Sequence, residues 1–264
     1  MKLKIPFLNR DPLVNVVRLQ GAITTAGRGL DDPSLAAVLQ KAFTRGKPKA
    51  VALQINCPGG SPVQSSLIAA RIRRLSQDHD VPVIAFVEDV AASGGYWLAC
   101  AADEIYADVG SLVGSIGVIA AGFGFHDLID RYGVERRVHT AGTSKSMLDP
   151  FRPEKPEDVQ KLEGWLTDLH EIFIDYVKSR REALLDDDPA IFSGEVWIGR
   201  KAEDKGLIDG IGHLIPVMKA MHGDKVKFRR YGPKKSLFAR LGARIMGDAI
   251  ASIEDRTAFA RFGL

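Results

Sequence analysis

Residues 91–97, AASGGYW, contain a serine whose surroundings suit a nucleophile. Ser93 follows an apolar run that is expected to be a buried strand, and two glycines come directly after it at the expected start of a helix. Small residues let the backbone turn sharply and let a substrate chain come close, and a helix N-terminus stabilises developing negative charge. Serine is also a common N-cap residue. On this segment alone, a nucleophile and a simple N-cap are equally good interpretations.

A second segment, INCPGGS at residues 55–61, sets Gly59 and Gly60 between a strand end and a helix start. Backbone N–H groups at such a junction point outward and lack intrahelical partners. They can hold the oxyanion of a tetrahedral intermediate, a contribution of roughly 3 kcal/mol in enzymes from which one donor was removed. Gly60 is the candidate donor. Taken in isolation, this segment is more simply an ordinary turn between a strand and a helix.

The third segment, TAGTSKSMLDPF at residues 140–151, sets Lys145 in a loop of small polar residues after a predicted strand. A lysine acts as a base near neutral pH only if burial or a cationic neighbour lowers its pKa from about 10.4 by several units. Most loop lysines are solvated surface charges. This segment alone therefore favours a surface residue.

Strands that alternate with helices must position these three segments. Strand-like segments are predicted at residues 14–23, 50–57, 81–89, 104–108, 115–123 and 134–142. Helical spacing predicts helices at residues 30–44, 62–78, 125–133 and 156–185, and a short helix is expected to start within residues 91–103. From residue 193 onward, the pattern predicts a short strand, a helix that ends at Gly206 and a further helix. This alternation predicts an α/β fold with a largely parallel sheet covered by helices. The apolar stripe of the long helix is expected to be buried against the core or a neighbouring subunit.

Composition limits the class of protein. The chain has 264 residues, of which 45% are hydrophobic and 26% charged, so we expect one main domain with appendages. The 36 basic and 33 acidic residues give a net charge of only +3, which argues against nucleic acid as a partner. Two cysteines cannot form a disulfide framework. No apolar run reaches the roughly 18 residues of a spanning helix, so we expect a soluble or peripheral protein.

The C-terminal residues 233–264 are predicted to form a basic amphipathic helix after a main domain at residues 1–232. Lys234, Lys235, Arg240 and Arg244 accompany an apolar stripe, which is compatible with binding at a membrane surface. Packing between subunits or a mobile tail is the favoured alternative.

Four motifs stand in order along the chain: PGGS at 58–61, ASGGYW at 92–97, GSIGV at 114–118 and SKSMLDPF at 144–151. In this order, and with Lys145 lying 52 residues after Ser93, the sequence resembles the S49 peptidase family, the signal peptide peptidases of the protease IV type, in their short single-repeat form. The resemblance runs from about residue 14 to residue 215. It implies the ClpP/crotonase fold, a spiral of β-β-α units with long flanking helices, which often assembles into rings.

The resemblance also implies a mechanism and its residues. Ser93 would attack the peptide carbonyl, Lys145 would take its proton as general base, Gly60 N–H would stabilise the oxyanion, and Ser115 would orient the lysine. A Ser/Lys dyad needs no carboxylate, metal or organic cofactor. The six histidines sit in no motif that makes a Ser-His-Asp triad convincing. The residues expected to bind substrate are Gly59, Gly94, Gly95 and Trp97.

The chain differs from the family pattern in three places. Cys57 stands where serine is more usual and is expected to be a buried structural thiol, and Trp97 stands where tyrosine is usual. Family members commonly carry an N-terminal membrane anchor, which is not seen here. We therefore expect a cytoplasmic protein or one peripheral to the inner membrane, unless an anchor is missing from the sequence.

The sequence thus predicts a serine endopeptidase that cleaves extended, mainly apolar peptides such as signal-peptide remnants or membrane-protein segments. The expected assembly is a homo-oligomer, either a ring or a tetramer. Two alternatives remain: a catalytically silent scaffold on the same fold, and a crotonase-like acyl-CoA enzyme, which would leave the Ser93 and Lys145 motifs unexplained.

Overall fold

The computed structural model describes residues 11–25, 29–142, 144–232 and 257–264. The predicted C-terminal amphipathic helix therefore lies outside the described residues, apart from the last eight. Within those eight, residues 257–260 are helical.

The strands of the described residues form one mixed sheet with the central order β6-β5-β3-β2-β1-β8, and β4 pairs with β3 and β7. The strands are β1 (Leu13–Gln20), β2 (Ala50–Cys57), β3 (Val83–Ala92), β4 (Glu104–Ala107), β5 (Leu112–Gly114), β6 (Val196–Ile198), β7 (Gly210–Ile211) and β8 (Lys227–Tyr231). All pairs are parallel except the β5–β6 pair. The predicted α/β class with a largely parallel sheet is confirmed.

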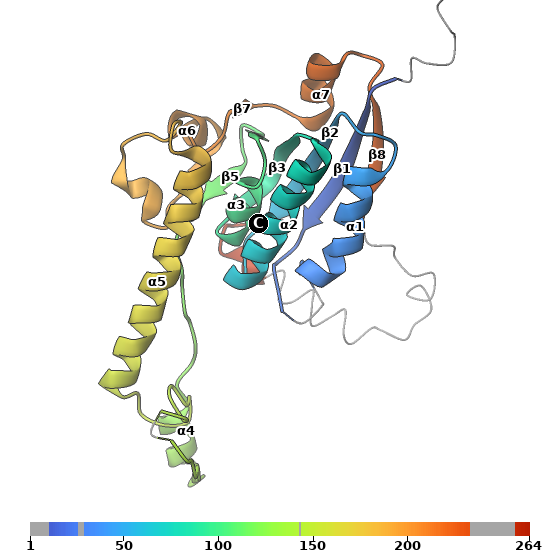
Figure 1. Ribbon diagram of the computed structural model, residues 1–264. Helices are drawn as coiled ribbons and strands as arrows, with labels where there is room; N and C mark the ends of the chain where they lie inside the picture. Colours follow the sequence, from blue (N-terminus) through green and yellow to red (C-terminus); the bar gives the residue numbers. More distant parts are fainter. Residues whose placement is uncertain (1–10, 26–28, 143, 233–256) are drawn as a thin grey trace, which may run out of the picture.

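Helices cover both faces of the sheet, which explains why β2 and β3 are almost continuously apolar. On one face α1 (Asp32–Thr44), α2 (Pro62–His79) and α3 (Gly94–Ala99) enclose the larger core. On the other face α7 (Leu214–His222) packs over a smaller cluster through Met218 (Figure 1). Asp31 and Ser61 cap the first two helices by accepting from backbone N–H groups.

The edge of β3 is divided between two neighbouring strands. Residues 84–87 pair with β4, whereas residues 90–92 pair with β5. Ala92 therefore lies opposite Gly114, and the next residues of the two strands, Ser93 and Ser115, are carried to the same end of the sheet. The fold thus brings the ASGGYW and GSIGV motifs together.

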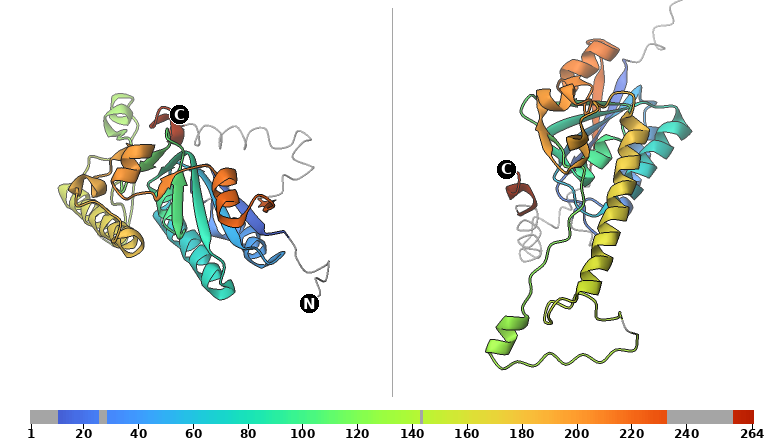
Figure 2. Two further views of the ribbon diagram at one scale, coloured as in Figure 1. Left: turned by 90° about the horizontal axis from the view of Figure 1, so that it is seen from above. Right: turned by 90° about the vertical axis from the view of Figure 1, so that its left-hand side faces the viewer.

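Residues 117–155, here called the arm, extend away from the sheet (Figure 2). The arm contains the short α4 (His126–Arg131) and leads into the 26-residue α5 (Pro156–Arg181). Beyond α5 the chain forms the short η1 (Pro189–Phe192) and α6 (Gly199–Asp204). None of the helices formed by the described part of the chain is long and apolar enough to cross a membrane.

The predicted strands at residues 115–123 and 134–142 are wrong. The described residues of both segments form no strand, because they extend away from the sheet and meet no partner strand. Apolar side chains in them, such as Ile119 and Phe123, are 74% and 81% exposed. The predicted long helix is confirmed but ends at Arg181 rather than near residue 185.

Candidate active site

Ser93 occupies a strained turn between β3 and α3. Its backbone has φ +52° and ψ −122°, a conformation that L-residues rarely adopt. The turn is fixed by hydrogen bonds from Ser93 N–H to the Gly114 carbonyl (2.8 Å) and from Trp97 N–H to the Ser93 carbonyl (3.0 Å). The side chain makes no cap hydrogen bond to α3. Ser93 therefore occupies the N-cap position without taking the N-cap role, and its hydroxyl is left for other chemistry.

The glycines of the two motifs allow close packing around this turn. A Cβ on Gly59 would lie 2.9 Å from Ser93 Cβ, and one on Gly95 would lie 2.1 Å from the Cys57 carbonyl oxygen. A Cβ on Gly94 would lie 2.5 Å from Ser65 Oγ. Side chains at these positions would push the Ser93 turn away from β2 and α2. The glycines therefore set the position of Ser93, an internal role that the substrate-binding prediction did not include.

The backbone N–H of Gly60 takes no part in the hydrogen bonds that the residues on either side of it make with Ile23. Ile23 N–H donates to the Gly59 carbonyl and Ser61 N–H donates to the Ile23 carbonyl, both at 2.8 Å, so the residues on either side of Gly60 are bonded. Gly60 N–H makes no hydrogen bond within the described part of the chain. Gly60 has φ +141° and lines the same cavity as Ser93. An unused donor beside a serine hydroxyl is the arrangement that an oxyanion requires.

The cavity beside Ser93, here called the Ser93 cavity, has a volume of about 240 Å³. Its walls are mainly apolar and come from the start of α2, from α3 and α5, and from residues 117–119. They include Pro62, Trp97, Val118, Ile119, Leu169 and Phe173. Trp97 is stacked between α3 and α5, with its ring centroid 4.7 Å from that of Phe173 and 5.0 Å from that of Tyr176. The cavity suits an apolar side chain or a short peptide segment.

The segment around Ser115 is held by hydrogen bonds just before the residues 117–119 that line this cavity. Ser115 has φ +52°, and its N–H donates to the Glu195 carbonyl at 2.6 Å. His170 on α5 lies with Nε2 3.0 Å from the Ile116 carbonyl oxygen, so its Nε2–H donates to that carbonyl. Sequence reasoning missed His170, because it is a single histidine in no motif.

A buried polar network fixes the far side of α3. The hydroxyl of Tyr96, which is fully buried, donates to the Leu207 carbonyl at 2.8 Å. Burial raises the pKa of Tyr96 well above its usual value, so this hydroxyl stays protonated. Arg181, 4% exposed, donates to the Gly206 carbonyl and pairs with Asp209 at 2.6 Å. The helix that follows Ser93 is therefore anchored to the segment between α6 and β7.

Lys145 lies on the arm and does not line the Ser93 cavity. It is exposed, and its neighbour Ser144 accepts a hydrogen bond from Lys161 Nζ at 3.1 Å, which ties the lysine loop to the start of α5. Leu169 and Phe173, which line the cavity, lie 8 and 12 residues later on α5, about 12 and 18 Å along the helix axis at 1.5 Å per residue. The structure thus brings Ser93, Gly60 and Ser115 together in one chain, but not Lys145.

The C-terminal residues enter the Ser93 cavity, which sequence reasoning did not anticipate. Arg261 lines the cavity, and its Nη2 donates to the Pro58 carbonyl at 3.0 Å. Burial lowers the pKa of Arg261 from its usual value. Residues 257–264 of the chain, here called the tail, therefore lie against the turn that carries Gly60.

Comparisons with known proteins match this chain to the family that its motifs resemble. The sequence model of peptidase family S49 matches residues 76–227. The chloroplastic serine protease SPPA of Arabidopsis thaliana is 33% identical over 201 residues, which cover 76% of this chain and 29% of that protein. A solved structure titled 1510-N membrane-bound stomatin-specific protease, a mutant in complex with a substrate peptide, has a TM-score of 0.49 and 15% identity, covering 93% of this chain and 99% of the other.

A protein of Brucella melitensis named Na(+)/H(+) antiporter NhaA is 46% identical over 271 residues, which cover 95% of this chain. The match covers 37% of that protein. The chain thus spans well under half the length of both curated relatives.

Proposed function

Because the chain belongs to peptidase family S49, we propose that it is a serine endopeptidase with Ser93 as its nucleophile. The observation that carries this proposal is the strained turn of Ser93, whose hydroxyl makes no cap hydrogen bond, beside the unused N–H of Gly60 in an apolar cavity. A nucleophile and an oxyanion donor in one cavity are the elements that acyl transfer needs.

The proposed reaction runs through an acyl-enzyme. Ser93 Oγ attacks the peptide carbonyl carbon and gives its proton to the uncharged amine of Lys145, while the carbonyl oxygen becomes an oxyanion bonded to Gly60 N–H. The C–N bond then breaks, and the leaving amine takes the proton from Lys145. Water hydrolyses the resulting ester, with Lys145 accepting and returning a proton. Ser115 is proposed to orient the Lys145 amine.

Lys145 is proposed to act on Ser93 of a neighbouring copy in a homo-oligomer. Its loop is tied to the start of α5 through the Lys161–Ser144 hydrogen bond, and the first wall residue on α5, Leu169, lies about 12 Å farther along the helix. The arm and the first part of α5 also expose large apolar side chains, including Ile119, Phe123, Tyr132 and Trp165, all more than half exposed. Docking a second copy on them would bury this surface, and burial of Lys145 would favour its uncharged form.

Substrates are proposed to be extended, mainly apolar peptides. The walls contributed by Trp97, Leu169 and Phe173 offer no charged group to a side chain in the cavity. The one basic side chain that lines the cavity within the described residues, that of Arg261, donates to the Pro58 carbonyl.

Labelling with a serine-reactive fluorophosphonate, followed by intact mass measurement, tests this function without a known substrate. We expect one adduct, on Ser93. Ser93→Ala should abolish the adduct, whereas Ser179→Ala, at an exposed position on α5, should retain it. If the assembled native protein forms no adduct, the peptidase proposal fails and the silent scaffold becomes the better account.

The tail is expected to slow access to Ser93. Because Arg261 lies in the Ser93 cavity on a tethered segment, removing residues 257–264 should raise the rate of fluorophosphonate labelling by about fivefold. Arg261→Ala should reproduce part of this increase, while Arg74→Ala, at an exposed position on α2, should not. Equal labelling rates for the full and shortened chains would contradict the expectation.

A further inference from the structure

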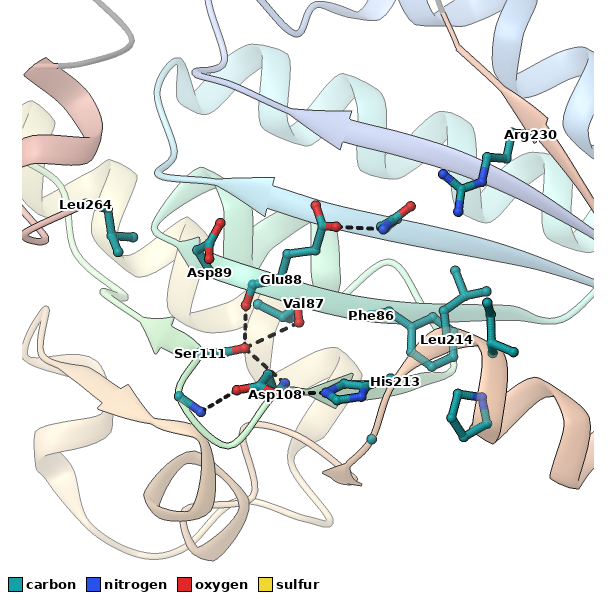
Figure 3. Close-up of a pocket in the computed structure, with 15 residues that line it drawn as sticks. Phe86, Val87, Glu88, Asp89, Asp108, Ser111, His213, Leu214, Arg230 and Leu264 are labelled. Carbon is teal, nitrogen blue, oxygen red and sulfur yellow. Dashed lines mark hydrogen bonds and ion pairs between the residues drawn. The ribbon is translucent and has the colours of Figure 1, made fainter.

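A second, larger cavity lies on the other face of the sheet, the face that α7 covers (Figure 3). It has a volume of about 600 Å³ and is here called the sheet-face cavity. Four consecutive residues of β3, Phe86 to Asp89, line it along the strand that leads to Ser93. The cavity therefore runs back along β3 from the end of the sheet that carries the candidate active site.

The end of this cavity nearer to Ser93 is acidic. Both carboxylate oxygens of Glu88 are occupied, by Gln54 at 2.6 Å and by Arg18 at 3.0 Å. Asp108 is bonded to Gly110 N–H and to His213, which together lower its pKa. Their charges are therefore largely satisfied within the protein.

Asp89 differs from these two carboxylates. The amide of Asn56, which is 7% exposed, donates to Asp89 and fixes its position. Asp89 is itself exposed, and it forms no ion pair with the residues that the structure describes. A fixed, exposed carboxylate at the edge of a cavity can pair with a cationic group of a ligand.

The opposite end of the cavity is mainly apolar, and Arg230 of β8 is the charged residue that lines it there (Figure 3). The ring of Phe86 is stacked on Tyr106 at 5.8 Å between centroids, and Leu214, Ile215 and Pro216 at the start of α7 complete this wall. Ile215 is 50% exposed. A ligand that fits the whole cavity therefore carries a cationic group and an apolar group on a common backbone.

The tail connects this cavity to the Ser93 cavity. Arg261 lines the Ser93 cavity, and Leu264, three residues later, lines the sheet-face cavity. In Figure 3, Leu264 lies at the same end of the cavity as Asp89. Three residues of extended chain span about 10 Å, so one short peptide can reach both cavities.

We propose that the sheet-face cavity binds the part of a peptide substrate that lies beyond the Ser93 cavity, pairing a lysine or arginine of the peptide with Asp89 and an apolar side chain with Phe86 and Leu214. This proposal rests on the proposed function, since it assigns both cavities to one substrate. It adds a preference for a basic residue a few positions from the scissile bond, outside the apolar segment that enters the Ser93 cavity.

Binding to the full-length Ser93→Ala protein tests the proposal without catalysis. Two fluorescent peptides are compared. Both contain an apolar segment followed by a C-terminal extension that would follow the path of the tail from the Ser93 cavity to the sheet-face cavity. They differ only at one residue of the extension, which is lysine in one peptide and glutamine in the other. Fluorescence anisotropy should give an affinity about fivefold higher for the lysine peptide, the size of a partly exposed charge pair. The preference should fall as salt concentration rises.

Adding Asp89→Asn should abolish the lysine preference and leave the affinity for the glutamine peptide unchanged. Asp78→Asn, which removes an exposed carboxylate from α2 on the other face of the sheet, should leave the preference intact. Equal affinities for the two peptides, or a preference that survives Asp89→Asn, would overturn the proposal. Native protein that fails to react with fluorophosphonate while the preference is present would overturn only the proposed function, so the two failures are distinguishable.

Discussion

Mixing Ser93→Ala protein with Lys145→Ala protein is expected to restore peptide hydrolysis that neither variant has alone. Each variant should lose at least about a thousandfold in kcat, since each lacks one member of the proposed dyad. After subunit exchange, a site between an intact Ser93 and an intact Lys145 forms in about a quarter of the random pairings, so hydrolysis should return to about a quarter of the native rate. The physical reason is the distance between the lysine loop and the Ser93 cavity within one chain.

The matched control replaces the Lys145→Ala protein with a double variant that carries both substitutions. Its mixture with Ser93→Ala protein contains no intact serine and should stay inactive. Hydrolysis of an apolar fluorogenic peptide, measured before and after exchange, gives the comparison. A mixture of the two single variants that exchanges subunits and still stays inactive would show that one chain supplies both groups after rearrangement of the arm.

Gly60→Ala is expected to lower kcat by about 100-fold to 1000-fold, the usual effect of losing one oxyanion donor. An added Cβ would lie 2.0 Å from the Ile23 carbonyl oxygen, and φ of +141° strains any side chain, so the turn must shift and move its N–H. KM should change little, because the donor acts mainly in the transition state. Steady-state kinetics on the same fluorogenic peptide measures both quantities.

Gly164→Ala serves as the matched control, since a Cβ at this position in α5 meets nothing within 4 Å. It should keep full activity and gain up to about 1 kcal/mol of helix stability. Thermal unfolding of Gly60→Ala separates a local effect from loss of fold. A folded Gly60→Ala protein with native kcat would remove Gly60 from the proposed mechanism.

The sequence predicted the elements that carry Ser93 and Gly60 because both depend on local signals. Apolar runs marked β2 and β3, and Pro and Gly marked the turns after them. The strain at Ser93 could not be predicted, because it depends on the hydrogen bond to Gly114, which comes from another strand. The order of the motifs indicated that Ser115 belongs to the same site as Ser93, but it gave no distance between the two residues.

The strand predictions in the arm were wrong for a physical reason. Its segments alternate like strands, yet a strand forms only where a neighbouring strand offers hydrogen bonds, and within the described residues none does so here. The reverse error occurred at β8, whose sequence KFRRY was not predicted as a strand. It pairs with β1 at the edge of the sheet, where charged side chains remain in water. The tail could not be placed either, because its hydrogen bond to Pro58 joins residues 203 positions apart.

The length of α5 has a consequence for any assembly. Its 26 residues extend for about 39 Å, with Phe173 and Tyr176 fixed against Trp97 in the second half and the lysine loop attached at the beginning. The helix therefore acts as a rigid spacer that fixes both the distance and the rotation about the helix axis between its two ends. One inserted residue between Lys161 and Phe173 would turn the lysine loop by about 100° around the helix axis and displace it by about 1.5 Å. In the proposed assembly, the spacing between Lys145 of one copy and Ser93 of the next would thus be set by the residue count of a segment that contains no proposed catalytic residue.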